Sequence, residues 1–193
     1  MVGFAIIVGA SFGAIAGFAG GWSDMILMRI MDIVLSFPAL LLAIAIVTLI
    51  GSGLVNAVAA VIIVSIPLYA RLTRSAVLST RENDYVTASR ALGESGSGIL
   101  RRRVLPNSIT PLIVAGSLGI ATAVLEVAAL SFLGLGIAEP VPEWGAMIGR
   151  DFNSIFSRPL LVLSPAFMLT VMVLGFNLLG DGIRDALDPR LNR

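Results

Sequence analysis

The residue types that most often carry out catalysis or bind metals are missing from this sequence. Its 193 residues include no Cys and no His, and every one of the 13 basic residues is Arg. The absence of Lys excludes a P-loop lysine and a Schiff base, and the absence of Cys and His excludes thiol or imidazole nucleophiles, bases and metal ligands. Only carboxylate chemistry is left open. We therefore predict no catalytic, cofactor-binding or metal-binding residue, no disulfide, and a chain that is not an enzyme by itself.

Residues 83–107 form one long polar, arginine-rich segment in a chain that is otherwise mostly apolar. Apolar side chains in its first part recur at helical spacing: Val86, Ala88, Ala91 and Leu92. Gly93 then permits a sharp turn, and residues 94–98 are rich in turn formers. A second short helix is predicted over residues 99–105, ahead of Pro106. We expect a helix, an elbow and a helix, an arrangement that suits docking into a groove on a partner protein.

The composition predicts that the rest of the chain lies in a membrane. The sequence is 57% hydrophobic and 13% charged, with a mean hydropathy of +0.97, which is too apolar for an ordinary soluble domain of this length. The net charge of +1 gives no reason to expect nucleic acid as a partner, since binding to phosphate backbones needs a concentrated basic face.

Five stretches are long and apolar enough to span a bilayer as helices. They are residues 2–20, 33–50, 54–69, 109–133 and 160–179. The third stretch is short, and we expect Pro67 to kink it. The predicted fold is an all-α membrane protein of about five transmembrane helices. Residues 1–193 form a single transmembrane domain in this prediction, with residues 83–107 as a cytoplasmic insert and residues 138–159 as an external loop.

The arginines predict the orientation of the chain in the membrane. If the insert is cytoplasmic, eleven of the 13 arginines fall on its side, and only Arg150 and Arg158 fall outside. The positive-inside rule favours this orientation. Five spans then place the N-terminus outside, which suggests that one preceding helix is absent from this chain.

Glycine recurs at every fourth residue in the first stretch and just beyond it, as Gly9, Gly13, Gly17 and Gly21. Residues with this spacing lie near one face of a helix and let another backbone approach closely. Generic helix packing and a specific subunit contact are both open for this face.

The insert resembles the cytoplasmic EAA loop of the permease subunits of ABC importers. That motif reads Glu-Ala-Ala, three residues, Gly, nine residues, Ile, one residue, Leu-Pro. Matching spacings are found for Thr87-Ala88-Ser89, Gly93 and Leu105-Pro106, with Thr87, Ser89 and Arg103 as departures. The dipeptide, oligopeptide and nickel branch of the family is similar in Asp84-Tyr85-Val86, Arg90-Ala91-Leu92-Gly93 and Leu105-Pro106-Asn107.

Further stretches, in order over nearly the whole chain, are similar to the C-type permease of that branch. They are Phe18-Ala19-Gly20-Gly21-Trp22, Met28-Arg29 with Asp32, Ser36-Phe37-Pro38, Tyr69-Ala70-Arg71, residues 130–136 (LSFLGLG), residues 144–147 (WGAM) and parts of residues 177–191. Members of the family usually have six spans, with a leading helix and a large external loop before the region where this chain begins.

The resemblance implies the architecture and the role of a type I ABC importer permease. In such importers two permease subunits form the pathway, two cytoplasmic ATPase subunits hydrolyse ATP, and an external solute-binding protein delivers the solute. The chain would be one of the two permeases in the cytoplasmic (inner) membrane of a bacterium or archaeon. Di- or oligopeptides are the expected solutes. The insert would be the coupling helix through which closure of the ATPases moves the spans.

Eight residues of the insert are the expected contacts for ATPase coupling: Tyr85, Ala88, Ser89, Ala91, Leu92, Gly93, Leu105 and Pro106. The small residues among them would let the helix enter a cleft, while Tyr85 and Leu92 would supply buried anchors. The three arginines at residues 101–103 are open to two roles, attraction to anionic membrane lipid or pairing with acidic residues of the ATPase.

Glu126 is the only carboxylate well inside a predicted span, about 25 Å along the helix from Ile109 and toward its outer half. An ionisable residue within a membrane is a functional hypothesis by default, so Glu126 is a candidate for the pathway or its gating. It could contact the amino terminus of a peptide or pair with an Arg of the other permease. It could also be neutral and hydrogen-bonded to Ser131 or to backbone.

The two ends of the last predicted span carry further expectations. In the external loop an apolar stripe at helical spacing fits the membrane headgroup region, a contact with the binding protein or the outer gate; it consists of Trp144, Met147, Ile148 and Phe152. Residues 181–191 are expected to be a short polar tail near the insert.

Two other functions stay open. An ion-coupled secondary transporter would carry coupling charges in broken helices near the membrane midplane, where Glu126 is the one acidic candidate. A nonfunctional structural fragment of a permease is the second alternative, because of the missing leading helix.

Overall fold

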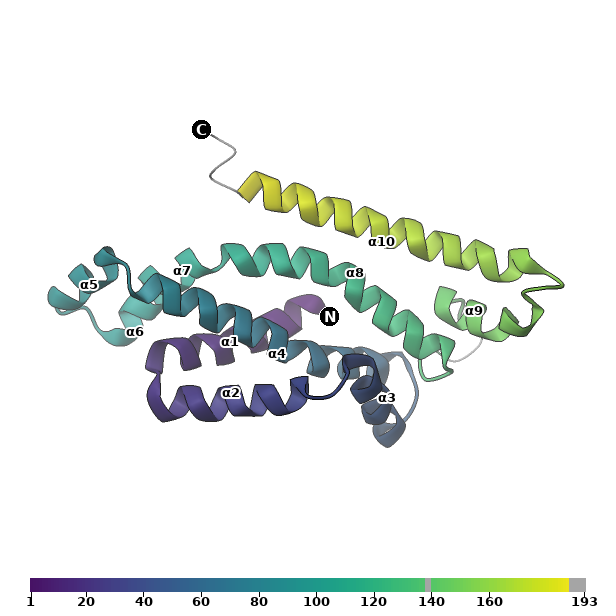
Figure 1. Cartoon of the computed structure of the whole chain (residues 1–193), viewed down its shortest axis with the longest axis horizontal. Helices are drawn as coiled ribbons and strands as arrows, with labels where there is room; N and C mark the ends of the chain where they lie inside the picture. The colour runs from purple at the N-terminus through teal and green to yellow at the C-terminus, as the bar shows by residue number, and fades with distance from the viewer. Residues whose placement is uncertain (138–139, 188–193) are drawn as a thin grey trace. The chain divides into compact units, whose positions relative to one another are not determined.

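The computed structural model describes residues 1–137 and 140–187, which form helices joined by short connections (Figure 1). In chain order the elements are α1 (Val2–Ala19), α2 (Gly21–Leu35), α3 (Ala39–Ile50), α4 (Leu54–Arg81), α5 (Asp84–Ala91), α6 (Gly96–Ile99), the π-helix η1 (Leu100–Val104), α7 (Leu105–Ser108), α8 (Thr110–Phe132), α9 (Trp144–Asp151), the 3-10 helix η2 (Phe152–Ser154) and α10 (Pro159–Leu187). No strand is found among the described residues. The predicted all-α fold is confirmed.

Four helices are long and apolar enough to cross a membrane, namely α1, α4, α8 and α10. The helices α2 and α3 reach that length only as a bent pair, which forms either a broken span or a re-entrant loop. The described residues therefore hold four candidate spans, or up to five if the bent pair is one span. This number agrees with the prediction of about five.

The predicted span over residues 33–50 is not one continuous helix, so that part of the prediction was wrong. α2 ends at Leu35, where the Ser36 N–H bonds to the carbonyl oxygen of Asp32 (3.0 Å) and the Ser36 hydroxyl bonds to that of Ile33 (2.6 Å). α3 begins only after Pro38. Proline has no N–H to donate and disfavours a helical conformation in the residue before it. The helix therefore ends ahead of Pro38 although the apolar pattern continues.

Two helices run past the ends of their apolar stretches. α4 continues from the predicted limit at residue 69 to Arg81, with Pro67 inside the helix, and α10 continues from residue 179 to Leu187. The predicted polar tail is therefore helical over residues 181–187, and its residues 188–191 lie outside the described residues. Hydropathy marks only the part of a helix that suits lipid, and the backbone hydrogen bonds continue beyond it.

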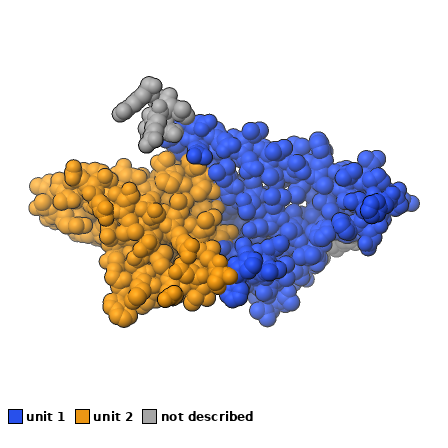
Figure 2. All heavy atoms as spheres, viewed as in Figure 1, with its two compact units in different colours: residues 1–2, 37–64, 117–193 blue, residues 3–36, 65–116 orange. Residues whose placement is uncertain are grey.

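The chain divides into two compact units (Figure 2). The insert unit, drawn in orange, holds residues 3–36 and 65–116, and the loop unit, drawn in blue, holds residues 1–2, 37–64 and the residues from 117 onward. Buried residues at the centre of the insert unit are Ala14, Val77, Val86, Ile99 and Val104. Those at the centre of the loop unit are Ala43, Val47, Ala57, Ala60, Val61, Val64, Ala123 and Leu130.

In the insert unit, α1 packs against α4 through three of its glycines. A Cβ atom added at Gly9 would lie 2.7 Å from a carbonyl oxygen of α4, and one at Gly17 would lie 3.0 Å from another. A Cβ atom at Gly13 would collide with the carbonyl oxygen of Ala70. Gly21 does not share this role, because nothing lies within 4 Å of its added Cβ atom. It is instead the first residue of α2, where its φ angle of +56°, together with that of +68° at Gly20, turns the chain between α1 and α2.

In the loop unit, α9 packs on the end of α8 through two glycines that the apolar spacing did not mark. A Cβ atom added at Gly145 would collide with the backbone of Ala128, and one at Gly149 would collide with that of Phe132. The rings of Phe132 and Phe152 meet edge to face, with their centroids 5.6 Å apart. Trp144, Met147 and Ile148 of the predicted stripe are half-buried. Residues 138–139 of the predicted external loop lie outside the described residues.

Candidate functional site in the polar insert

The two helical parts of the insert, before and after Gly93, are called here its first and second arms. The first arm forms as the sequence predicts. α5 spans Asp84–Ala91, with Asn83 in an extended conformation just before it. Asp84 places a negative charge in the first turn of α5, and Arg90 places a positive charge in the last turn. Both charges interact favourably with the helix dipole. This interaction stabilises α5, which at 8 residues is short for a helix.

The elbow between the two arms is a hydrogen-bonded helix end. The N–H of Gly93 bonds to the carbonyl oxygen of Arg90, and the N–H of Glu94 bonds to that of Ser89, both at 3.1 Å. This pair of bonds is a Schellman motif, and Gly93 supplies the left-handed residue that it needs, with a φ angle of +81°. The hydroxyl of Ser95 then accepts a bond from the Gly98 N–H (3.3 Å) and begins the second arm. The sharp turn predicted at Gly93 is confirmed.

The second arm is longer than predicted. Helical structure runs from Gly96 through η1 to Ser108, so Leu105-Pro106 lies within the helical run and does not close it. In η1 the Leu105 N–H bonds to the carbonyl oxygen of Leu100, five residues back. Pro106 follows in the first turn of α7, where a missing N–H costs little.

Both arms are fixed to the core of the insert unit. Val86 of α5, Ile99 of α6 and Val104 of η1 are buried in one cluster with Ala14 of α1 and Val77 of α4. A force on α5 would therefore pass through packed side chains to α1 and α4, because closely packed cores deform little.

Two buried hydroxyls add a polar link between the second arm and α4. The Ser108 hydroxyl lies 3.0 Å from that of Thr80, and it also bonds to the carbonyl oxygen of Val104 (2.8 Å). Each buried hydroxyl thus has a partner, as buried polar groups need.

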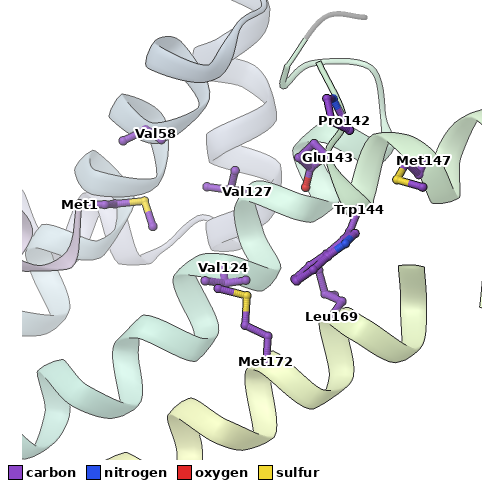
Figure 3. Close-up of a pocket in the computed structure, with 10 residues that line it drawn as sticks. All are labelled: Met1, Val58, Val124, Val127, Pro142, Glu143, Trp144, Met147, Leu169 and Met172. Carbon is purple, nitrogen blue, oxygen red and sulfur yellow. The ribbon is translucent and has the colours of Figure 1, made fainter. Parts of the chain in front are cut away.

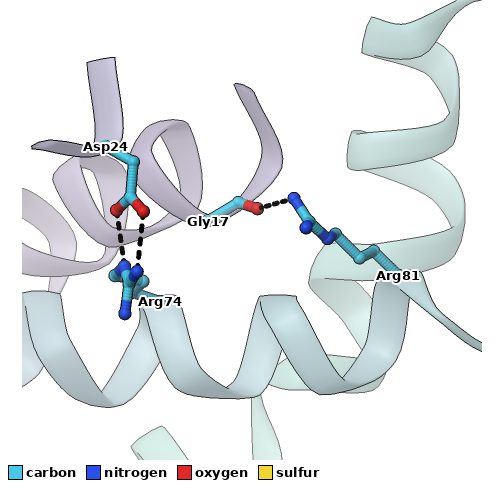
Figure 4. Close-up of polar contacts among 4 residues, drawn as sticks. All are labelled: Gly17, Asp24, Arg74 and Arg81. Carbon is cyan, nitrogen blue, oxygen red and sulfur yellow. Dashed lines mark hydrogen bonds and ion pairs between the residues drawn. The ribbon is translucent and has the colours of Figure 1, made fainter. Parts of the chain in front are cut away.

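Two arginines of α4 form hydrogen bonds to the neighbouring helices α1 and α2 (Figure 4). Arg74 binds Asp24 of α2 with two parallel bonds, from Nε to Oδ1 (2.5 Å) and from Nη2 to Oδ2 (2.6 Å). Arg81 donates from Nη1 to the carbonyl oxygen of Gly17 (2.7 Å). That carbonyl belongs to the last turn of α1, where carbonyl groups lack partners within the helix and a positive charge is favourable.

A second ion pair joins α4 and α2, between Arg71 and Asp32 at 2.5 Å. The role of these carboxylates was not predicted from the sequence. The signal that could have found it is the presence of opposite charges within two apolar segments, because a charge in such a segment needs a partner.

An apolar row of side chains runs along the exposed side of α5. Tyr85, Ala88 and Leu92, which we call the outer ridge, share this face at i, i+3 and i+7, and the side chains of Tyr85 and Leu92 are 42% and 88% exposed. Ser89 is only 8% exposed and faces the core of the unit. The other residues that were expected to contact the ATPase differ in their exposure. Ala91, Gly93 and Pro106 are exposed, and Leu105 is half-buried.

Glu126 lies on α8 in the loop unit and is half-buried. The hydrogen bond to Ser131 that was considered for it is not formed, since the buried Ser131 hydroxyl has no hydrogen-bond partner in the described part of the chain. Ser131 packs instead against Gly136, where an added Cβ atom would collide with the hydroxyl. Glu126 forms no ion pair with another described residue.

An apolar cavity of about 580 Å³ lies in the loop unit (Figure 3). It is lined by Met1, Val58, Val124, Val127, Pro142, Glu143, Trp144, Met147, Leu169 and Met172. The carboxylate of Glu143 accepts bonds from the N–H groups of Gly145 (3.0 Å) and Ala146 (2.8 Å) at the start of α9. That carboxylate acts as a helix cap, so the cavity mainly offers apolar contacts.

The apolar helices and the polar insert define the class of the protein as an all-α, multi-span membrane protein. Residues 9–193 match the family described as the inner membrane component of binding-protein-dependent transport systems, and the chain belongs to this family. The family assignment made from the insert and the further motifs is confirmed.

Three curated relatives cover nearly the whole chain. The dipeptide transport system permease protein DppC of Alkalihalophilus pseudofirmus is 50% identical over 97% of this chain and 62% of its own length. The di/tripeptide transport system permease protein DppC of Pseudomonas aeruginosa is 47% identical over 96% and 61%. The glutathione transport system permease protein GsiD of Pectobacterium atrosepticum is 44% identical over 96% and 62%. The chain thus spans about three-fifths of the length of these relatives.

A solved structure shares the fold. A chain of the MetNI methionine ABC transporter in an inward-facing conformation superposes with a TM-score of 0.75, covering 97% of this chain and 89% of that chain at 21% identity. The predicted permease architecture is therefore confirmed at the level of the fold.

Proposed function

We propose that this chain is a permease subunit of an ATP-driven, binding-protein-dependent importer of di- or oligopeptides. The family supports the transport role, and the names of the three relatives support the solute, since dipeptides, tripeptides and glutathione are all small peptides. The chain forms half of the pathway together with a second permease. Two cytoplasmic ATPase subunits hydrolyse ATP, and an external binding protein delivers the peptide.

The coupling role rests on one observation, the exposure of the outer ridge. A helix that places Val86 in the core and leaves Tyr85 and Leu92 exposed has a second apolar face that no other described residue covers. Anchors at i, i+3 and i+7 are the pattern by which a helix fills a groove on another protein. We assign the outer ridge to a groove on the ATPase, with Leu92 and Tyr85 as the main anchors.

The elbow and the shared core support transmission of the ATPase motion. The Schellman motif at Gly93 fixes the angle between the two arms, and the core around Val86 links α5 to α1 and α4. Ser89 faces this core, so its contribution to coupling is to hold α5 in place and not to touch the ATPase.

The test is ATP-driven uptake of a labelled dipeptide by the full complex in proteoliposomes. Leu92→Asp places a charge on the outer ridge, and we expect it to lower uptake about tenfold or more and to reduce copurification of the ATPase. Thr87→Asp is the matched control, because Thr87 is exposed on the same helix but lies off the ridge. We expect this variant to keep most of the uptake.

Two results would contradict the proposal in different ways. Equal uptake by the Leu92 and Thr87 variants would remove the outer ridge as the coupling surface while leaving the transport role intact. Uptake that follows a proton gradient and ignores ATP would overturn the importer itself in favour of an ion-coupled transporter.

A further inference from the structure

One face of α8 in the loop unit combines polar groups with apolar side chains that do not belong to the core. Thr122 is exposed, and Glu126 is half-buried one turn later on the same side of the helix. Ala123 and Leu130, which neighbour Glu126 on the helix surface, are buried in the core cluster of the unit. Glu126 therefore lies at the border of the core, with Thr122 on the side that points away from it.

An ionised carboxylate at this depth needs either water or a cation. Glu126 is about 24 Å along α8 from Thr110 and about 9 Å from the end at Phe132, so it lies within the span and not at its margin. Ionisable groups in membrane spans are costly when they face lipid, and they face protein or water-filled cavities instead. The described part of the chain supplies no cationic partner for Glu126.

The other carboxylates on or beside apolar helices are used within the chain or lie near a helix end, as Asp181 and Asp185 do in the last two turns of α10. Asp24 and Asp32 are paired with arginines of α4, and Glu143 caps α9. Glu126 is thus the carboxylate that lies within the apolar part of a described span and that pairs with no other described residue, so it can bind a ligand from outside the chain.

We propose that Glu126, with Thr122 beside it, forms the site on the pathway wall that binds the protonated amino group of the peptide. The inference rests on the proposed function and names the chemical group that the pathway recognises. Small peptides differ in their side chains, but they share an ammonium group at one end, and a carboxylate with a neighbouring hydroxyl is suited to accept its hydrogen bonds.

The neighbouring residues fit a site that selects the ammonium group of the peptide and tolerates different peptide side chains. Leu125 and Leu133 are exposed beside Glu126, at 43% and 50%, and offer apolar contact without a fixed hydrogen-bond pattern. A single charged contact also permits release, because a transport site must bind strongly enough for the solute to enter and weakly enough for it to leave.

The native chain contains no Cys, which permits a test at one chosen residue. Thr122→Cys would be made in the full complex with cysteine-free partner subunits, and its reaction rates with a cationic and an anionic methanethiosulfonate reagent of similar size would be compared. We expect the cationic reagent to react about five- to tenfold faster, relative to the ratio for a free thiol, because of the nearby carboxylate. Adding Glu126→Gln should bring the normalised ratio to about one.

Ile113→Cys is the matched control, since its side chain is exposed on the same helix about 20 Å along the axis from Glu126. We expect its rate ratio to change much less on Glu126→Gln. A Thr122→Cys thiol that does not react with either water-soluble reagent would overturn the inference, because the site would then face lipid or protein. A ratio unaffected by Glu126→Gln would also overturn it.

A transport measurement separates this inference from the proposed function. We expect Glu126→Gln to assemble normally and to keep ATPase stimulation by the loaded binding protein, while peptide uptake per ATP falls about tenfold; Glu126→Asp should keep more of the uptake. Loss of the second permease from the Glu126→Gln complex would show that the carboxylate pairs with that subunit, against the inference. Absence of ATP-driven uptake by the native complex would instead count against the proposed function.

Discussion

The helices α1 and α10 are both apolar enough to cross a membrane, but they pack very differently within their own units. In the apolar window of α1 33% of the residues are buried, against 11% in that of α10. α1 presents Gly9, Gly13 and Gly17 to the backbone of α4. Of the α10 glycines, by contrast, Gly175 and Gly182 have nothing within 4 Å of an added Cβ atom, and only Gly180 lies close to α8, at Leu118.

The difference shows that apolar character does not determine which spans pack tightly. Lipid tails are as apolar as the side chains of a helix, so burial of apolar surface gives little net attraction between helices in a membrane. Small residues allow backbones to approach, and the dispersion and hydrogen-bonding contacts that follow provide the stability. α1 has such residues on one face, and Arg74 and Arg81 of α4 add polar bonds around it.

The largest expected effect is that of a methyl group between α1 and α4. We expect Gly13→Ala to lower the free energy of unfolding by about 3 kcal/mol, because the added Cβ atom would meet the carbonyl oxygen of Ala70. The same change at Gly175 of α10 should be neutral or stabilising by up to about 1 kcal/mol, since the site is open and Ala favours a helix. Reversible unfolding in mixed micelles measures both values. Equal effects at the two sites would remove the packing difference between these helices.

A smaller effect is expected at the two ion pairs between α4 and α2. A double-mutant cycle on Asp24 and Arg74 should give a coupling energy of about 1–2 kcal/mol, because that pair has two parallel bonds and is partly buried, with 20% and 35% of the side chains exposed. The pair of Asp32 and Arg71 is 45% and 51% exposed and should give about 0.5 kcal/mol or less. A reversed order, measured by the same unfolding assay, would mean that exposure does not control the strength of these pairs.

The smallest expected effect is at the end of α1. Arg81→Gln removes the charge from the bond to the Gly17 carbonyl but leaves an N–H donor. We expect a loss of about 0.5–1 kcal/mol, because a charge at a helix C-terminus contributes about this much. Arg102→Gln is the control, as Arg102 is exposed on the insert. An equal effect of the two variants on unfolding would show that the contact with α1 does not matter.

Local rules predicted much of the insert. The apolar spacing predicted α5, and Gly93 predicted the turn, because both depend on interactions between residues near each other in sequence. The second arm was predicted too short, since the rule that Pro ends a helix does not hold in a first turn such as that of α7. The break before Pro38 was missed for the opposite reason. The prediction followed the continuous apolar pattern of residues 33–50 and gave no weight to Pro38, which ends the helix in the structure.

The candidate site depended more on the tertiary structure. Spacing alone gave α5 one small apolar face, but it did not separate the residues that bury against α1 and α4 from the outer ridge. Ser89 and Ala88 are adjacent in sequence, and only the packing of α5 places Ser89 inside and leaves Ala88 outside. The motif spacing could not make this distinction, because a motif records positions along the chain and not directions in space.

The sequence by itself determined the membrane class, the approximate number of spans, the family and the elbow at Gly93. These properties depend on composition or on contacts within a few residues, and neither requires knowledge of where distant parts of the chain lie. The tertiary structure alone decided which glycines meet α4, which carboxylates find an arginine and which apolar residues stay exposed. Those outcomes depend on the relative placement of helices far apart in sequence, and in a membrane that placement follows from close packing and paired charges, which hydropathy does not measure.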